Sequence, residues 1–142
     1  MPLEENKVIG RRVFEEVFNK RNLAVADELL TPDSLNHDDP HGVGPVGPES
    51  LKQAVQMLCA AFPDLRITIE DVIAEGDKVF IRTTSSGTHH GAFMGIAPTG
   101  KRFTQQQMHL IRVVDGKVTE HWDVRDDLGM MQQLGVIPAP GR

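Results

Sequence analysis

The first half of the chain carries apolar residues at helical spacing. Within residues 4–20, apolar side chains recur every three or four positions and charged side chains take the opposite face, which predicts an amphipathic helix. Asn22 is of a residue type that caps helices, and it predicts a short second helix over Leu23–Leu30. Residues 33–47 are rich in proline, glycine and histidine and indicate a loop. A third helix is expected over residues 48–62, because the proline at its start suits a first helical turn.

After the third helix the apolar period changes to two, which is the period of a β-strand. Residues 65–75 alternate in this way, but the apolar phase slips near Asp71, and a β-bulge there would bend the strand. Asp115-Gly116 is a strong hairpin signal between two later strands. Further strands are expected over residues 78–88, 101–114 and 117–125, followed by a short closing helix over residues 128–134.

Helices that precede a run of antiparallel strands predict an α+β fold. The 142 residues contain no internal repeat, linker or low-complexity tract, so we expect a single domain over residues 1–142. A strongly bent sheet wrapped over the N-terminal helices would leave a cone-shaped pocket between the two layers. The sequence therefore predicts a site for a small molecule inside the fold.

Composition narrows the classes of partner. The formal net charge of −5 argues against nucleic acid or an anionic membrane surface as the partner. Cys59 is the only cysteine, so no internal disulfide is possible, and its apolar surroundings predict an inert thiol in a helix. No segment resembles a signal peptide and no apolar run has the length of a membrane span, so we expect a cytoplasmic protein.

Side chains able to transfer protons gather beside the predicted hairpin. In the strand that follows the turn, His121, Asp123 and Arg125 share one face by alternation, and His109 lies in the strand before it. A carboxylate drawn into an apolar pocket becomes a stronger proton acceptor, so Asp123 is the candidate general base. The imidazoles could bind an oxyanion, orient Asp123 or act as the acid. Spacing alone leaves open a second interpretation, a solvated polar face on an edge strand.

The hairpin register decides whether His109 joins this face. A two-residue turn would pair His109 with Trp122 and point the two histidines to opposite faces of the sheet. A three-residue turn with a glycine bulge would place His109 opposite His121, and Gln107 opposite Asp123. Both turns are compatible with Asp-Gly.

Motifs spread along the chain resemble the SnoaL-like polyketide cyclases (ester cyclases). The resemblance runs from about residue 5 to residue 137. It implies the cone-shaped α+β fold of nuclear transport factor 2 and ketosteroid isomerase, and an intramolecular aldol condensation without metal or cofactor. The motifs that carry it are Asn36-His37-Asp38, Ala61-Phe62-Pro63-Asp64-Leu65, Gly87-Thr88-His89, the glycine-rich stretch over residues 91–101, and Glu120-His121-Trp122-Asp123.

The resemblance also implies the residues of a site. It assigns the acid–base role to Asp123, places His109 and His121 beside it, and thereby favours the three-residue turn. The loop after the second helix would line the pocket mouth, and the apolar residues of the glycine-rich loop would form a lid. The substrate-binding residues expected on this basis are Asn36, His37, His89, Phe93, Met94 and Gln107.

The function expected is a cofactor-independent cyclase that performs acid–base chemistry on a small apolar carbonyl compound. No metal is expected, because no ligand set with metal-binding spacing is evident. One alternative is another acid–base enzyme, such as an isomerase, a dehydratase or an epoxide hydrolase. Asp123, Arg125 and Asp126 weakly resemble the Asp–Arg–Asp set of limonene epoxide hydrolases, although Asp126 would face the other way. The absence of tyrosine argues against an oxyanion hole of the ketosteroid isomerase type.

Two further expectations concern binding. A non-catalytic small-molecule binding protein is the other alternative, and a firm salt bridge between Asp123 and Arg125 would favour it. A homodimer or homotetramer is expected because one sheet face needs cover, although helices could supply that cover instead. The residues assigned to this face are Met108, Leu110, Val118 and Trp122.

Overall fold

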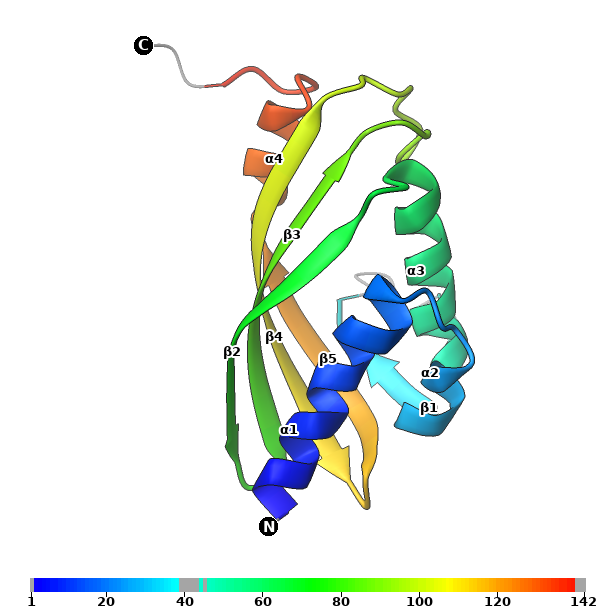
Figure 1. The fold of residues 1–142 in the computed structure, drawn as a ribbon, viewed down its shortest axis with the longest axis vertical. Coiled ribbons are helices and arrows are strands. Elements are labelled where there is room, and N and C mark those ends of the chain that lie inside the picture. The colour runs from blue at the N-terminus through cyan, green and yellow to red at the C-terminus, as the bar shows by residue number, and fades with distance from the viewer. Residues whose placement is uncertain (1, 39–43, 45, 140–142) are drawn as a thin grey trace.

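The computed structural model describes residues 2–38, 44 and 46–139. Its centre is a five-stranded sheet with the strand order β1-β5-β4-β3-β2. Figure 1 shows α1, α2 and α3 on one side of this strongly curved sheet and α4 near the end away from α1. The elements are α1 (Pro2–Arg12), the π-helix η1 (Val13–Asn19), α2 (Val25–Leu29), β1 (Leu30–Asn36), α3 (Pro48–Ala61), β2 (Arg66–Glu75), β3 (Lys78–Thr88), β4 (Arg102–Val114), β5 (Lys117–Arg125) and α4 (Asp127–Gln133).

The N-terminal helix forms where its apolar spacing predicts, but its winding changes halfway. After Arg12 the helix continues as the π-helix η1, which buries Phe14, Val17 and Phe18. π-helical turns are rare and frequently lie at functional sites. α1 lies close to β3 at Gly10: a Cβ at this position would come within 2.7 Å of the Ile81 side chain.

The loop expected over residues 33–47 is partly wrong, because Leu30–Asn36 forms the strand β1. β1 pairs in parallel with β5 at the edge of the sheet, an arrangement in which Pro32 is tolerated. The short helix before it is also shorter than expected: α2 begins after Ala24 without a side-chain cap, so the capping role expected for Asn22 is wrong. Residues 39–43 and 45 of the expected loop lie outside the described residues.

The remaining strands form the antiparallel meander that the alternating pattern predicts. β2 pairs with β3, and the pairing shifts by one residue between Ile69 and Asp71, which confirms the bulge expected near Asp71. β3 pairs without interruption with β4 along its whole length. The bend in β2 and the long β3–β4 ladder give the sheet the curvature seen in Figure 1.

The β4–β5 hairpin has neither of the two registers considered from the sequence. Asp115 and Gly116 both have positive φ, of 50° and 76°, as a two-residue type I′ turn requires, and Val114 pairs with Lys117. The pairing then shifts by one at a bulge opposite Arg112–Val113, which leaves Thr119 as the extra residue of β5. His109 consequently pairs with Asp123, so the expected pairing of His109 with His121 is wrong.

A cavity lies between the concave face of the sheet and the helices. Its walls include Phe14 and Phe18 from η1, Leu58 from α3 and Ile81 from β3. Val118 also lines it, because the bulge at Thr119 turns Val118 and His121 to the same face. Val118 is therefore buried in the core, and its expected place on an outer sheet face is wrong.

Candidate active site

Two histidines and a carboxylate meet on the concave face of the sheet. The Nδ1 atom of His109 lies 2.9 Å from Nε2 of His121 and 3.9 Å from Oδ2 of Asp123. The two imidazole rings stack with centroids 5.2 Å apart, and the Phe14 ring covers His109 from η1 at 4.8 Å. The structure thus brings together the three residues to which the sequence assigned the chemistry, although by a different register.

Asp123 is a buried carboxylate that has few donors. Its side chain is 3% exposed, and its Oδ1 atom has no hydrogen-bond donor among the described residues. Burial, followed by the neighbouring Asp38 carboxyl, raises the pKa of Asp123 to about 7, although Arg125 opposes that rise. A carboxylate with this pKa can accept a proton near neutral pH and can also return it.

Arg125 links the two carboxylates. Its Nη1 atom lies 2.6 Å from Oδ2 of Asp38 and 3.4 Å from Oδ2 of Asp123. The shorter contact shows that the guanidinium is held mainly by Asp38, and Asp123 keeps only a long contact with it. The salt bridge between Asp123 and Arg125 is therefore present, but it does not hold Asp123 firmly ionised, because burial and Asp38 raise the pKa of Asp123 to about 7.

The two histidines lie in an environment that disfavours charge. Burial lowers the pKa of His109 to about 3, with further contributions from His121 and Arg125. Burial likewise lowers the pKa of His121 to about 4, and the neighbouring Asp38 carboxylate acts in the opposite direction. Each ring has a partner at both nitrogens, because His109 Nε2 lies 2.9 Å from Gln107 Oε1 and His121 Nδ1 lies 2.8 Å from Asn36 Oδ1.

The cluster opens into a cavity of about 500 Å³, which is within the usual range for small-molecule sites. Most of the wall is apolar, and its polar groups are concentrated at the cluster. α4 contributes Met130 and Met131 to one end of the wall. This is a pocket in which an apolar molecule could be enclosed next to a proton acceptor.

Four of the six residues expected to bind a substrate line this cavity. Asn36 and Gln107 lie in its polar part, each bonded to one of the histidines. Phe93 and Met94 line it from the glycine-rich loop. Met94 lines the cavity although it is 74% exposed, so its side chain lies at the boundary between the cavity and solvent. Its backbone has a positive φ of 49°.

The other two expected binding residues do not line the cavity. His37 lies on the outer face of the sheet, where it stacks on Trp122 at 4.8 Å and its Nε2 lies 3.0 Å from Glu120. His89 is fully buried, and its Nδ1 accepts the backbone N–H of Thr99. The ring of His89 therefore anchors the loop that carries Phe93.

Several polar residues that line the cavity were not expected from the sequence, and three of them lie near the cluster or α4. Asp38 lines the cavity beside the Asn36-His37 motif, and Gln105 and Asp127 line it near α4. Gln105 shares a strand face with Gln107 by alternation, a signal that could have identified it. Asp126, by contrast, caps α4 by accepting the Gly129 N–H. This capping role gives no support to the Asp–Arg–Asp set considered above.

The three acid–base side chains also offer ligand atoms of the kind that bind metal ions. Ligand atoms of His109, His121 and Asp123 all lie within 4.8 Å of one another. All four imidazole nitrogens already have hydrogen-bonding partners, so an ion would have to displace at least one of these contacts. We therefore assign no metal to the cluster.

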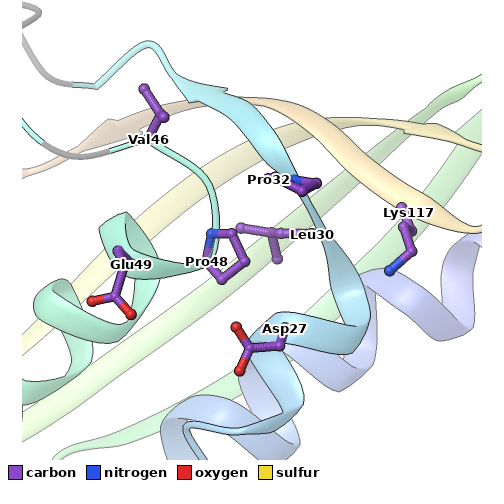
Figure 2. A pocket seen from close by; sticks show the side chains of 7 residues that line it. All are labelled: Asp27, Leu30, Pro32, Val46, Pro48, Glu49 and Lys117. Atoms are coloured by element: carbon purple, nitrogen blue, oxygen red, sulfur yellow. The ribbon is translucent and has the colours of Figure 1, made fainter.

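A second, smaller hollow of about 320 Å³ lies near the start of β1 (Figure 2). Figure 2 shows Asp27, Glu49 and Lys117 among its lining residues. Asp27 and Glu49 both pair with Lys52, at 2.8 Å and 3.7 Å, and the Lys117 ammonium donates to the Glu28 backbone carbonyl at 3.0 Å. No histidine is among the described residues that line this hollow.

None of the helices in the described part of the chain has the length and apolar character needed to cross a membrane.

Known proteins resemble this chain both in sequence and in structure. The family model described as SnoaL-like polyketide cyclase matches residues 9–134. Nogalonic acid methyl ester cyclase from Streptomyces nogalater is 36% identical over 121 residues, which cover 83% of this chain and 89% of the relative. Aklanonic acid methyl ester cyclase DnrD from Streptomyces peucetius is 37% identical over 110 residues, which cover 76% of this chain and 72% of the relative.

Solved structures show the same fold. IdmH from Streptomyces antibioticus superposes with a TM-score of 0.77 at 34% identity, covering 92% of this chain and 99% of IdmH. AclR from Streptomyces galilaeus, described as a candidate hydroxylase, superposes with a TM-score of 0.82 at 30% identity, covering 99% of this chain and 87% of AclR. The fold alone therefore does not determine the reaction, which has to be inferred from the residues of the site.

Proposed function

This chain belongs to the SnoaL-like polyketide cyclase family, and from that membership we propose that it closes a ring in a polyketide methyl ester with Asp123 as the acid–base residue. The observation that carries the proposal is the position of Asp123. Its carboxyl is buried beside two imidazoles, in an apolar cavity of about 500 Å³. The curated relatives named above are methyl ester cyclases, which supports an ester of this class as the substrate.

The reaction proposed is the ring-closing addition of an intramolecular aldol reaction. The Asp123 carboxylate removes a proton from a carbon next to a carbonyl, and the electron pair of the broken C–H bond is delocalised onto the oxygen as an enolate. The enolate carbon then attacks a second carbonyl of the same molecule, which forms the ring C–C bond and leaves an alkoxide. The alkoxide takes back one proton, so no atom is lost and no oxidant or reductant is needed.

The cavity contributes mainly by holding the substrate in a folded conformation. Two carbons of one flexible molecule must meet, and enclosure by apolar walls lowers the entropic barrier to that meeting. Phe93 and Met94 border the cavity from the loop after β3, and they would cover the substrate once it is bound. The buried imidazole of His109 or His121 can donate a hydrogen bond to the enolate or alkoxide oxygen when it exchanges one of its present partners for that oxygen.

The test is the variant Asp123→Asn, assayed by substrate loss and product formation on an aromatic polyketide methyl ester. Loss of the general base is expected to reduce kcat by about 10²–10⁴-fold. Asp71→Asn is the matched control, because Asp71 is an exposed sheet carboxylate paired with Arg82. Full turnover by Asp123→Asn would remove Asp123 from the mechanism. Turnover should also survive dialysis against a metal chelator, since the proposed reaction uses no metal or cofactor.

We also propose a single-domain, cytoplasmic protein that assembles into a homodimer or homotetramer. The outer face of the sheet exposes apolar side chains, among them Met108 at 48% and Val124 at 75% exposure, which pair with each other across the hairpin, next to the pair of Leu110 with Trp122. An apolar patch on a sheet supports self-association. Light scattering after size-exclusion chromatography should give at least twice the 15.7 kDa chain mass, and a monomer would contradict this proposal.

A further inference from the structure

A continuous chain of polar side chains crosses the floor of the cavity from Asn36 to Asp127. Each member contacts the next through atoms that can donate or accept a hydrogen bond. The members come from β1, β4, β5 and α4, so the chain joins four elements at the site. In order, the contacts are Asn36 Oδ1 to His121 Nδ1 at 2.8 Å, His121 Nε2 to His109 Nδ1 at 2.9 Å, His109 Nε2 to Gln107 Oε1 at 2.9 Å, Gln107 Nε2 to Gln105 Oε1 at 2.8 Å, and Gln105 Nε2 to Asp127 Oδ1 at 3.0 Å.

Both ends of this chain are acceptors. The backbone N–H of Asp38 donates to Oδ1 of Asn36 at 3.1 Å, and this bond identifies the Asn36 atom that faces His121 as the amide oxygen. At the other end Asp127 offers a carboxylate, which also faces Nε of Arg125 at 3.5 Å. A carboxylate in an ion pair can only accept.

The donors in the chain are one too few when both histidines are neutral. A neutral imidazole donates at one nitrogen and accepts at the other, and a primary amide in the chain likewise donates to one neighbour and accepts from the next. His121, His109, Gln107 and Gln105 therefore supply four donors for the five contacts between the two acceptor ends. Flipping the amide of either glutamine moves the contact that lacks a proton, but it does not supply one.

We propose that Asn36 and Gln105 are positioning residues that leave the His109–His121 pair one proton short, so that the pair receives the proton that Asp123 takes from the substrate. The inference rests on the proposed function for the origin of that proton. Asp123 then returns to a carboxylate, and the imidazolium donates the proton to the alkoxide formed by ring closure. The electron pair of the C–H bond stays with the substrate throughout.

Asp123, with a pKa of about 7, holds a proton more tightly than either buried imidazole, so this transfer is uphill and is drawn forward by protonation of the strongly basic alkoxide. The charges around the pair act in both directions. The carboxylates of Asp123 and Asp38 face it and favour a proton there, whereas Arg125 and His37 oppose one. From η1, the apolar Phe14 ring packs on His109. Burial lowers the pKa of each imidazole, but a proton on the pair gains an acceptor at every ring nitrogen, which an isolated buried imidazole lacks.

The test is Gln105→Met. Gln105 is only 4% exposed, and methionine keeps the length of its side chain. The substitution removes the amide, so the series of hydrogen bonds then stops at Gln107. Gln107 can then turn its amide and donate to His109, so the shortened chain is complete without an added proton. The histidine pair should therefore hold a proton less tightly. Gln106→Met is the matched control, because Gln106 is exposed on the neighbouring position of the same strand.

The readout is a pH titration of the imidazole nitrogens by NMR in histidine-labelled protein without substrate. Gln105→Met should lower the apparent pKa of the pair by at least about 1 unit, a tenfold loss of proton affinity, and Gln106→Met should leave it unchanged. Equal values in wild type and Gln105→Met would overturn the proposal. Asn36→Asp is the second variant: it keeps an acceptor for the Asp38 N–H, and it should raise the apparent pKa of the pair. A fall or no change there would also overturn the proposal.

Turnover separates this proposal from the proposed function. With a polyketide methyl ester, Gln105→Met should lower kcat at least tenfold at unchanged KM, because the substrate still binds but its proton has no ready acceptor. A wild-type protein that turns over no such ester would refute the proposed function, while the titration would still decide the proton count. A titration shift with unchanged kcat would overturn the transfer from Asp123 to the pair.

Discussion

His109 and Asp123 occupy paired positions on β4 and β5, and their side chains lie on the same face of the sheet with Nδ1 and Oδ2 3.9 Å apart. This pairing depends on the extra residue Thr119, which shifts the ladder by one. Without the bulge, the two-residue turn would pair His109 with Trp122 and send the two imidazoles to opposite faces. A bulge beside the turn therefore assembles the acid–base cluster.

The first prediction concerns the pH dependence of turnover. Burial raises the pKa of Asp123 to about 7, and the base must be ionised to remove a proton. kcat/KM should therefore rise as pH increases through about 7, and should fall about tenfold per unit below it. Initial rates between pH 5 and pH 9 measure this, with a substrate that does not titrate in that range. A flat profile would show that no group with this pKa controls the reaction.

The second prediction concerns Arg125, whose charge lowers the pKa of Asp123. In Arg125→Gln that effect is lost and Asp38 loses its 2.6 Å partner, so the pKa of Asp123 should rise further. The midpoint of the pH profile should move upward by at least about 1 unit. Arg112→Gln is the control, because Arg112 pairs with Asp77 and Glu120 outside the cavity. A downward shift in Arg125→Gln would contradict the assignment.

The strands and long helices could be predicted from the sequence because their patterns are local. The strands expected over residues 78–88 and 117–125 have the bounds of β3 and β5 as observed. β1 could not be predicted in this way, since Leu30–Asn36 has a proline and polar residues and becomes a strand only by pairing with β5. Its sequence alone favours a loop.

The candidate site was predictable in its residues and not in its geometry. Asp123, His109 and His121 were named from alternation and resemblance, whereas their approach depends on the bulge at Thr119. The position of His37 also needed the structure, because the course of the chain after β1 decides which of two adjacent side chains faces inward. Loop side chains have no period from which their direction could be read.

The third prediction concerns Met94, which lines the cavity although it is 74% exposed. A bound apolar substrate should cover this side chain, and burial of an apolar side chain of this size contributes roughly 1.5–3 kcal/mol. Met94→Asn, a residue that tolerates the positive φ, should therefore raise KM about tenfold or more and leave kcat within about twofold. Steady-state kinetics measure this split. Leu128→Asn is the control, since Leu128 is 59% exposed but does not line the cavity. Equal effects of both variants would exclude a specific role for Met94.

The last prediction separates the neighbours Asn36 and His37. Asn36 bonds to His121 in the cavity, whereas His37 stacks on Trp122 outside it. His37→Ala should leave kcat and KM within about twofold and lower the free energy of unfolding by roughly 0.5–1.5 kcal/mol, the contribution of an aromatic pair. Asn36→Ala should instead lower kcat at least about tenfold, because His121 loses the partner of its Nδ1 atom. Chemical denaturation and steady-state kinetics on both variants measure the two effects. A loss of turnover in His37→Ala larger than that in Asn36→Ala would show that the outer face, and not the cavity, contributes to the reaction.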